Sequence, residues 1–279
     1  MRNKTMTILL VGSLTVLLVA CSGAAKNQAQ VGVIAIGHSG MTGFSSGPNG
    51  RGSDAPENSW ATGTAPEVNS VYQRLVAVRP ETAGHVANLA KDGATATALA
   101  DQARAALLEV PTPELVLIQT IDNDIRCDGT DPANLDAFGA AIGDALNVVA
   151  EASPKSHILL LSQFGRPATF AATLESNPGA IAQFFAGSGG MCDLFNLDGS
   201  PNPEGIASLT AIIESYEAEE DRVCAAVPQC SRDGGASAGM VDDLADWVPG
   251  DWNHLNVHGH ARLAETIWPT VAELLGVGS

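Results

Sequence analysis

Short apolar runs recur along the chain, and each predicts a strand that is buried on both faces. The first is followed at once by Gly37, a residue that commonly marks the end of a strand. Such strands are predicted at residues 31–36, 84–89, 115–121 and 157–162, and the second is the most weakly marked. A fifth strand should lie within 231–250, where the pattern is poor, and residues 51–71 should form a loop rich in Gly, Ser, Pro and Asn.

Between these runs, apolar residues recur at the spacing of helices that face a core. Helices are predicted at residues 94–109, 134–152, 168–185, 204–226 and 255–275. The last of these should be kinked or interrupted near Pro269. Strands that alternate with helices predict an α/β fold, in which helices cover both faces of a central, mostly parallel sheet of about five strands.

The first twenty residues are typical of a targeting segment that is removed before folding. Two basic residues precede an apolar stretch at 8–19, which is short for a bilayer span of about 20 residues. The following Leu-Val-Ala-Cys resembles the lipobox of bacterial lipoproteins, whose cysteine, here Cys21, is lipidated. We therefore expect a signal peptide at 1–20, a tether at 21–30, one domain at 31–279 and a lipid anchor in the cell envelope. An ordinary cleaved signal is the alternative.

The composition is strongly acidic, with 31 Asp and Glu residues against 14 Lys and Arg and a net charge of −17. Residues 1–20 hold two basic and no acidic residues, so the mature chain would carry −19. This charge argues against nucleic acid, because binding to phosphates relies on Lys and Arg. The same negative charge argues against electrostatic binding to anionic lipid, so the lipid anchor would hold the protein at the membrane.

Four cysteines follow Cys21, and an even number in an exported chain suggests two disulfides with three possible connectivities. Cys224 with Cys230 would close a short loop, and we favour this pairing together with Cys127 and Cys192. The sequence contains no Cys-x-x-Cys, and the spacing matches no zinc site, so metal binding is the weaker interpretation.

Residues with useful chemistry follow the predicted strands. Ser39 follows the first strand, Gly93 the second and Asn123 the third, while Asp251 and His254 precede the last helix. Parallel sheets place their sites at the carboxyl ends of strands, so these loops should meet at one edge. Asp251 and His254 lie three residues apart and could meet on one turn. The alternative is that Asp251 only caps the last helix.

These residue types suit nucleophilic attack on an acyl carbon. A serine hydroxyl is weak until a base takes its proton, and His254, oriented by Asp251, would be that base for Ser39. The developing oxyanion would be held by the backbone N–H groups of Ser39 and Gly93 and by the amide of Asn123. Such a site uses no metal and no other cofactor.

In this order, the residues resemble the signature blocks of the SGNH (GDSL-type) hydrolases. Gly37-His38-Ser39-Gly40 resembles the GDSxxxG block, and the sequences around Gly93 and Asn123 resemble the second and third blocks. Asp-Trp-Asn-His-Leu-Asn at 251–256 resembles DxxHxN, and residues 57–60 resemble a stretch that often lines the substrate groove. The resemblance spans about residues 33–268. It implies a flavodoxin-like three-layer fold and a serine esterase or lipase mechanism.

Two positions depart from the family's pattern. His38 stands where an Asp usually precedes the nucleophile, and we expect it to support the loop through other hydrogen bonds. An acid–base role for His38 is the alternative. Ile121 replaces a Gly two residues before Asn123 and should extend the third strand, which would alter the placement of Asn123.

Three other interpretations are weaker. The α/β-hydrolase elbow is GxSxG, but Met41 occupies its last Gly position, and that class does not place its acid three residues before its His. His254, His258 and His260 cluster, but no HExxH motif is present, and polar residues at a helix start explain them more simply. A non-catalytic lipoprotein that binds a glycan or a partner would use the same fold.

The sequence leaves the substrate open. Lipid acyl esters and acylated carbohydrates both fit these residues, and nothing indicates the oligomeric state. Trp60, Trp247 and Trp252 either line a substrate groove or pack in the core.

Overall fold

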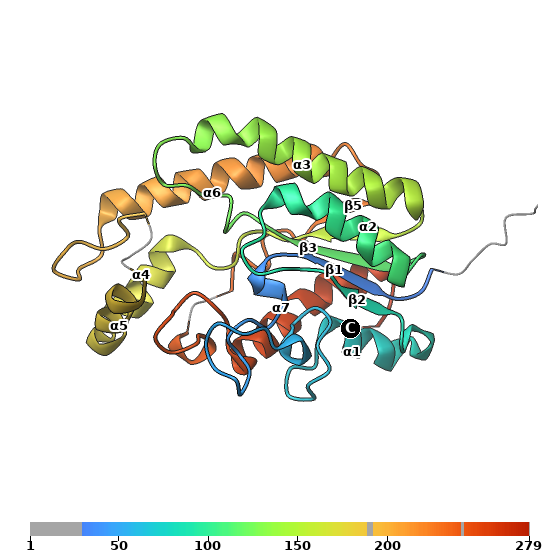
Figure 1. The fold of residues 1–279 in the computed structure, drawn as a ribbon, viewed down its shortest axis with the longest axis horizontal. Coiled ribbons are helices and arrows are strands. Elements are labelled where there is room, and N and C mark those ends of the chain that lie inside the picture. The colour runs from blue at the N-terminus through green and yellow to red at the C-terminus, as the bar shows by residue number, and fades with distance from the viewer. Residues whose placement is uncertain (1–29, 189–191, 241–242, 279) are drawn as a thin grey trace, which may run out of the picture.

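Within residues 30–188, 192–240 and 243–278, which the computed structural model describes, five short strands form one parallel sheet (Figure 1). The strands are β1 (Val33–Gly37), β2 (Val86–Asn88), β3 (Leu115–Gln119), β4 (His157–Leu160) and β5 (Cys230–Arg232). Their order in the sheet is β2-β1-β3-β4-β5, which is the order of flavodoxin-like folds. The predicted fold class is therefore confirmed. The poorly marked fifth strand begins at Cys230, one residue before the region in which the sequence places it.

Seven α-helices accompany the sheet in the described residues. They are α1 (Val71–Val78), α2 (Leu99–Glu109), α3 (Asp131–Ala152), α4 (Pro167–Glu175), α5 (Pro178–Ser188), α6 (Pro203–Cys224) and α7 (Val257–Leu275). None of the helices in this part of the chain is long and apolar enough to cross a membrane.

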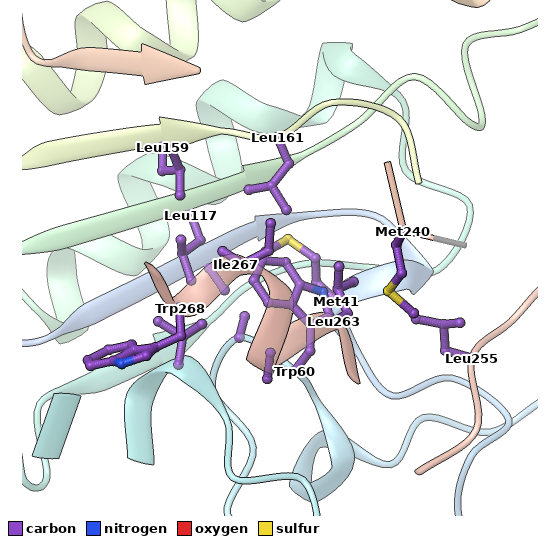
Figure 2. Packing of buried hydrophobic residues seen from close by; sticks show 14 of the residues in the cluster. Met41, Trp60, Leu117, Leu159, Leu161, Met240, Leu255, Leu263, Ile267 and Trp268 are labelled. Carbon is purple, nitrogen blue, oxygen red and sulfur yellow. The ribbon is translucent and has the colours of Figure 1, made fainter. Parts of the chain in front are cut away.

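Alternate residues of the strands face two separate cores, as the pleat of a strand requires. Val33 and Ala35 of β1 belong to the core beneath α1 and α7, part of which Figure 2 shows. Ile34 and Ile36 belong to the core beneath α2, α3 and α6. The sheet is thus the middle layer of three, and α4 and α5 extend beyond the carboxyl ends of its strands (Figure 1).

The helices differ from the sequence prediction in four respects. Helix α2 begins at Leu99, after a 3-10 turn at Ala96–Ala98, and not at residue 94. Helix α1 begins at the end of the expected loop because Ser70 and Gln73 form a capping box at its start. The predicted helix 168–185 is divided into α4 and α5 at Asn177, since a residue before proline disfavours helical geometry and Pro178 suits a first turn. Helix α7 continues through Pro269, whose missing hydrogen bond is offset by burial of the helix's apolar face against the sheet.

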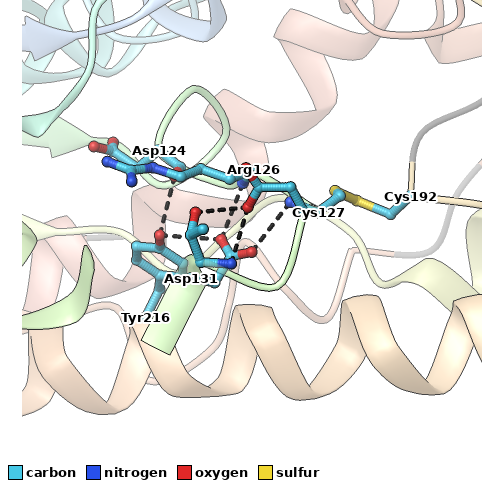
Figure 3. The surroundings of a disulfide bond; sticks show 8 residues. Asp124, Arg126, Cys127, Asp131, Cys192 and Tyr216 are labelled. Carbon is cyan, nitrogen blue, oxygen red and sulfur yellow. Dashed lines mark hydrogen bonds between the residues drawn. A yellow bond between two sulfur atoms is a disulfide. The ribbon is translucent and has the colours of Figure 1, made fainter. Parts of the chain in front are cut away.

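Two disulfides tie these elements together. Cys224 is bonded to Cys230, and Cys127 is bonded to Cys192, which is the pairing favoured from the sequence. The second bond joins the loop after β3 to the segment that leads into α6 (Figure 3). The predicted signal peptide, Cys21 and the tether as far as residue 29 lie outside the described residues.

Candidate active site

The site begins where β1 ends. Gly37 has a φ of 147°, and a Cβ there would overlap the carbonyl oxygen of Gln119 on the neighbouring strand, so this close approach requires glycine. The side chain of Gln102 bonds both to the N–H of Gly37 at 2.7 Å and to its carbonyl oxygen at 3.0 Å. The chain then turns sharply into a short 3-10 helix, Ser39–Met41, so that Ser39 stands at the carboxyl edge of the sheet.

A buried tryptophan supports this turn from the side of the core. Trp60 is fully buried, and its indole N–H donates to the carbonyl oxygen of Gly40 at 3.1 Å. Its ring belongs to the same buried cluster as Met41 and Leu263 of α7 (Figure 2). The stretch 57–60 therefore positions the Ser39 turn through Trp60, which lies in the core and does not line a groove.

Ser39, His254 and Asp251 form one hydrogen-bonded chain. His254 Nε2 lies 3.1 Å from Ser39 Oγ, and His254 Nδ1 lies 3.2 Å from Asp251 Oδ2. A neutral imidazole that carries its proton on Nδ1 satisfies both contacts, because it donates to the carboxylate and accepts from the hydroxyl. The ring of Phe44 packs on His254 with its centroid 4.6 Å away.

The loop that carries the acid and the imidazole is an irregular turn before α7. Asp251 Oδ1 accepts the backbone N–H groups of Asn253 at 3.0 Å and His254 at 3.2 Å. Trp252 takes a left-handed φ of 48°, which lets the chain turn back between the two partners. Burial raises the pKa of Asp251, but these hydrogen bonds and the His254 ring outweigh it and leave the pKa below its usual range.

The alternative role of Asp251 as the helix cap is wrong. Helix α7 begins at Val257, and its cap is Asn256, whose side chain accepts the N–H of Gly259 at 3.1 Å. The amide of Asn256 also donates to the carbonyl oxygens of Ala245 and Trp247, which anchors the loop. Asp251 is thus left to bind the His254 imidazole.

His38 occupies the position before the serine and is buried. Its Nδ1 accepts the N–H of Gly40 at 3.0 Å, and its Nε2 lies 3.8 Å from Asp122 Oδ2. Burial lowers the pKa of His38, and this effect outweighs the opposing influence of Asp122. His38 therefore supports the serine turn through its hydrogen bond with Gly40.

The loops that carry Gly93 and Asn123 meet beside this turn. Lys91 donates its N–H to the carbonyl oxygen of Gly37 at 3.0 Å, which brings the loop after β2 to the end of β1. Asn123 donates its side-chain amide to the carbonyl oxygen of Ala94 at 3.0 Å. Gly93, with a φ of 70°, lies in the turn between Lys91 and Ala94. The structure thus brings the residues singled out from the sequence to one sheet edge.

Ile121 does not extend β3, contrary to the expectation from the sequence. The strand ends at Gln119, and Ile121 has a left-handed φ of 86°, the region that glycine adopts without strain. Its side chain is fully buried in the core beneath α2 and α3. Its carbonyl oxygen accepts the N–H of Asp124 at 2.7 Å and so closes the turn that presents Asn123. The buried side chain thus holds a backbone shape that normally requires glycine.

Three further polar residues lie near the site, and the sequence motifs assign them no role, although Asp122 and Asp124 flank Asn123 in the third block. Asp122 is hydrogen-bonded to Gln163, which follows β4, so the same strand-end rule would have found Gln163. Asp124 is buried, accepts the N–H of Ala96, and has a pKa that burial raises to about 6. These contacts connect the loops after β2, β3 and β4.

The clustered histidines have separate surroundings. His254 contacts Ser39 and Asp251, whereas His258 Nδ1 lies 2.7 Å from Asp246 Oδ1. His260 is buried in α7, and burial lowers its pKa to about 3. The three imidazoles do not share one binding geometry.

An open cavity adjoins the loop of His254. Trp252 and Asn253, the two residues between Asp251 and His254, line it together with Trp247. Asp122 and Gln163 line it on the side of the β3 and β4 loops. Two of the three tryptophans noted in the sequence therefore face this cavity, and Trp60 does not.

Comparison with known proteins identifies the fold. No protein-family model matches the chain, and a search of curated proteins also gives no match. An extracellular lipase from Streptomyces rimosus is 14% identical with a TM-score of 0.52, and the match covers 88% of this chain and 99% of the lipase. A protein of Parabacteroides merdae ATCC 43184, provisionally described as a GDSL-like lipase, is 13% identical with a TM-score of 0.52 over 89% of this chain and 97% of its own.

A two-domain esterase active on acetylated mannans is also similar. It is 17% identical with a TM-score of 0.51, and the match covers 89% of this chain and 50% of the esterase. The chain therefore has the three-layer fold shared by GDSL-like lipases and esterases, as the resemblance of its motifs to the SGNH hydrolases implies.

Proposed function

We propose that this protein is a serine ester hydrolase that cleaves carboxylic acyl esters. The observation that carries the proposal is the hydrogen-bonded chain from Asp251 through His254 to Ser39 at the carboxyl edge of the sheet. A nucleophile, a base and a group that orients the base are the parts that acyl transfer requires. The folds of the similar lipases and esterases support the same reaction class.

In the proposed mechanism, His254 Nε2 takes the proton of Ser39 as the hydroxyl oxygen attacks the ester carbonyl carbon. The imidazolium that forms is stabilised by Asp251. The alcohol then leaves with the proton from His254, and the acyl group remains on Ser39. Water, deprotonated by the same imidazole, releases the acid and restores the hydroxyl.

The oxyanion of each tetrahedral intermediate requires fixed donors. We assign this role to the backbone N–H groups of Ser39 and Gly93 and to the side-chain amide of Asn123. The hydrogen bond from Asn123 to Ala94 orients that amide before the substrate arrives. A single donor of this kind is worth about 10²–10³ in kcat.

The test combines turnover with covalent labelling. The purified domain should hydrolyse p-nitrophenyl butyrate and react with a fluorophosphonate at Ser39. Ser39→Ala and His254→Ala should lose nearly all turnover, whereas Ser215→Ala, at an exposed serine of α6, should not. Full turnover by Ser39→Ala would overturn the mechanism. Absence of both turnover and labelling in the wild type would favour a binding protein on this fold.

We also propose that the mature chain is exported and anchored through a lipid on Cys21. The proposal rests on the lipobox-like sequence at 18–21, and the two disulfides of the described residues are consistent with an oxidising compartment. In a bacterial host, the wild type should incorporate labelled palmitate and sediment with membranes. Cys21→Ala should do neither, and an unchanged membrane fraction would contradict the anchor.

A further inference from the structure

We propose that the cavity beside His254 receives an aliphatic chain of the ester substrate, so that esters with medium-length chains are preferred over those with short ones. This inference rests on the proposed esterase function and specifies its substrate class. The cavity is open to solvent, and its empty space together with the mouth is about 700 Å³.

The cavity lies next to the loops that carry His254 and Asn123. Trp252 and Asn253 line it and are covalently part of the loop that holds Asp251 and His254. Asp122, which also lines it, directly precedes Asn123 in the chain. A substrate whose carbonyl lies between Ser39 and Asn123 would therefore have the cavity next to its ester group.

The interior of the cavity is apolar. Helices α4, α5 and α6 contribute Phe170, Phe184, Leu209 and Ile213, and Trp247 closes the wall. The Phe170 ring packs edge to face against Trp247 and Phe184, with centroids 5.4 and 5.8 Å apart. Each methylene group of a ligand that this wall removes from water makes binding more favourable.

The charges around the cavity favour a neutral chain over a free fatty acid. Among the residues that line it, Arg166 is the one cation, and its guanidinium bonds to both carboxylate oxygens of Glu217 at 3.1 and 2.9 Å. Asp122 adds a negative charge on the side of the β3 loop. A carboxylate ligand would therefore meet a lining whose one cation, Arg166, is already paired with Glu217, and it would lie near the like charge of Asp122. A neutral ester avoids both effects.

The polar groups of the lining also disfavour a sugar in the interior. Asp122, Gln163 and Asn253 belong to the loops at the carboxyl edge of the sheet, whereas the helices supply aromatic and aliphatic side chains. A sugar ring would bury several hydroxyl groups there without hydrogen-bond partners, and each unpaired group is costly. A sugar as the alcohol part of the ester would thus remain outside.

The disulfide Cys127–Cys192 fixes one side of the cavity. Leu194, which lines it, lies two residues after Cys192, and Ile125 lies two residues before Cys127. Asp131 accepts the backbone N–H groups of Arg126 and Cys127 and the hydroxyl of Tyr216 from α6 (Figure 3). The cavity wall is therefore held in place before a substrate arrives, which lowers the cost of binding an apolar chain.

Two ester series test the inference and identify which part of the substrate enters. One series keeps the p-nitrophenyl group and extends the acyl chain from acetate through butyrate to octanoate. The other keeps the acetyl group and extends the alcohol from ethanol to octanol. We expect kcat/KM to rise by up to about fourfold per methylene in one series, as expected from the burial of CH₂ groups. The series that shows the rise identifies the acyl or the alcohol chain.

Variants locate the effect in the cavity. Leu209→Trp, which fills it, should lower the ratio of kcat/KM for the longest ester to kcat/KM for the shortest ester of the responsive series by about tenfold or more. Ile213→Ala, which enlarges it, should shift the preference to longer chains. Leu108→Trp is the matched control, because Leu108 is an exposed residue of α2.

The outcomes separate this inference from the proposed function. Equal kcat/KM along both series, with acetate turnover and Ser39 labelling intact, would overturn the cavity inference and leave the esterase standing. A normal chain-length preference in both Leu209→Trp and Ile213→Ala would also overturn it. Loss of turnover of every ester together with absence of labelling in the wild type would instead overturn the esterase itself.

Discussion

His38 Nδ1 accepts the backbone N–H of Gly40 at 3.0 Å, and the ring thereby closes the turn that carries Ser39. The accepting nitrogen holds no proton, so a neutral imidazole carries its proton on Nε2, which lies 3.8 Å from Asp122. We propose that His38 positions Ser39, since His254, not His38, contacts the serine hydroxyl.

Replacing His38 by Asn and by Leu should give different results. Asn presents a short acceptor that can bond the N–H two residues ahead, so His38→Asn should retain most of the activity. Leu presents no acceptor, the turn loses its bond, and kcat for p-nitrophenyl butyrate should fall by about 10- to 100-fold with little change in KM. The melting temperature of each variant shows whether the fold is intact. Wild-type kcat in a folded His38→Leu protein would exclude the positioning role.

Asp251→Asn tests the orientation of the imidazole without disturbing the loop. The new amide oxygen can still accept the N–H groups of Asn253 and His254, but an NH₂ group would face His254 Nδ1. The imidazole would then carry its proton on Nε2 and could not take the proton of Ser39, so kcat should fall by about 10²–10⁴.

Steady-state kinetics on p-nitrophenyl butyrate measure the effect of Asp251→Asn, and Asp243→Asn is the matched control. Asp243 makes a similar bond to a backbone N–H, that of Ala245, but lies away from the imidazole. The control should keep its kcat. If both variants behaved like the wild type, Asp251 would have no part in orienting His254.

Much of the site follows from the sequence because it depends on topology. The carboxyl ends of parallel strands share one edge, so Ser39, Gly93 and Asn123 are expected together once their strands are recognised. The alternation of elements likewise predicts the three layers. The cavity could not be predicted, because its walls come from α4, α5, α6 and the loop before α7, whose relative placement depends on packing.

Local rules also failed where tertiary structure overrides them. The substitution of Gly by Ile at position 121 predicts a longer strand, because β-branched residues favour extended backbone. In the structure, burial of that side chain holds a left-handed φ of 86° instead. Strain of this kind costs about 1–3 kcal/mol and persists only where the surroundings enforce it.

A pair of truncations measures the strain at Ile121. Ile121→Ala and Ile121→Gly both remove a buried side chain and should destabilise the protein by about 2–5 kcal/mol. Glycine normally costs about 0.5–1 kcal/mol more than alanine inside regular structure. At position 121 the order should reverse, because glycine tolerates the left-handed backbone and alanine does not.

Urea unfolding of the four variants Ile121→Ala, Ile121→Gly, Ile118→Ala and Ile118→Gly provides the comparison. Ile118 is equally buried but lies within β3, so its glycine variant should be the less stable of its pair. The same order at both positions would show that the backbone at Ile121 is not strained.

Glu220 should make the stability of the protein depend on pH. It is fully buried on α6 beside Arg232, and burial raises its pKa from 4.5 to about 8 despite that cation. Between these two pH values, the folded protein keeps this carboxyl protonated while the unfolded chain ionises it. The folded state then binds the extra proton, so the contribution of Glu220 to the free energy of unfolding falls as pH rises through this window.

Glu220→Gln removes this titration, and thermal melts between pH 5 and pH 8 should reveal the change. The melting temperature of the wild type should fall relative to that of Glu220→Gln as pH rises, and each lost kcal/mol shifts the melting temperature of a domain of this size by about 2–4 °C. Glu214→Gln, at an exposed position of the same helix, should follow the wild type. Parallel pH curves for the wild type and Glu220→Gln would mean that Arg232 keeps the Glu220 carboxylate ionised in the folded protein.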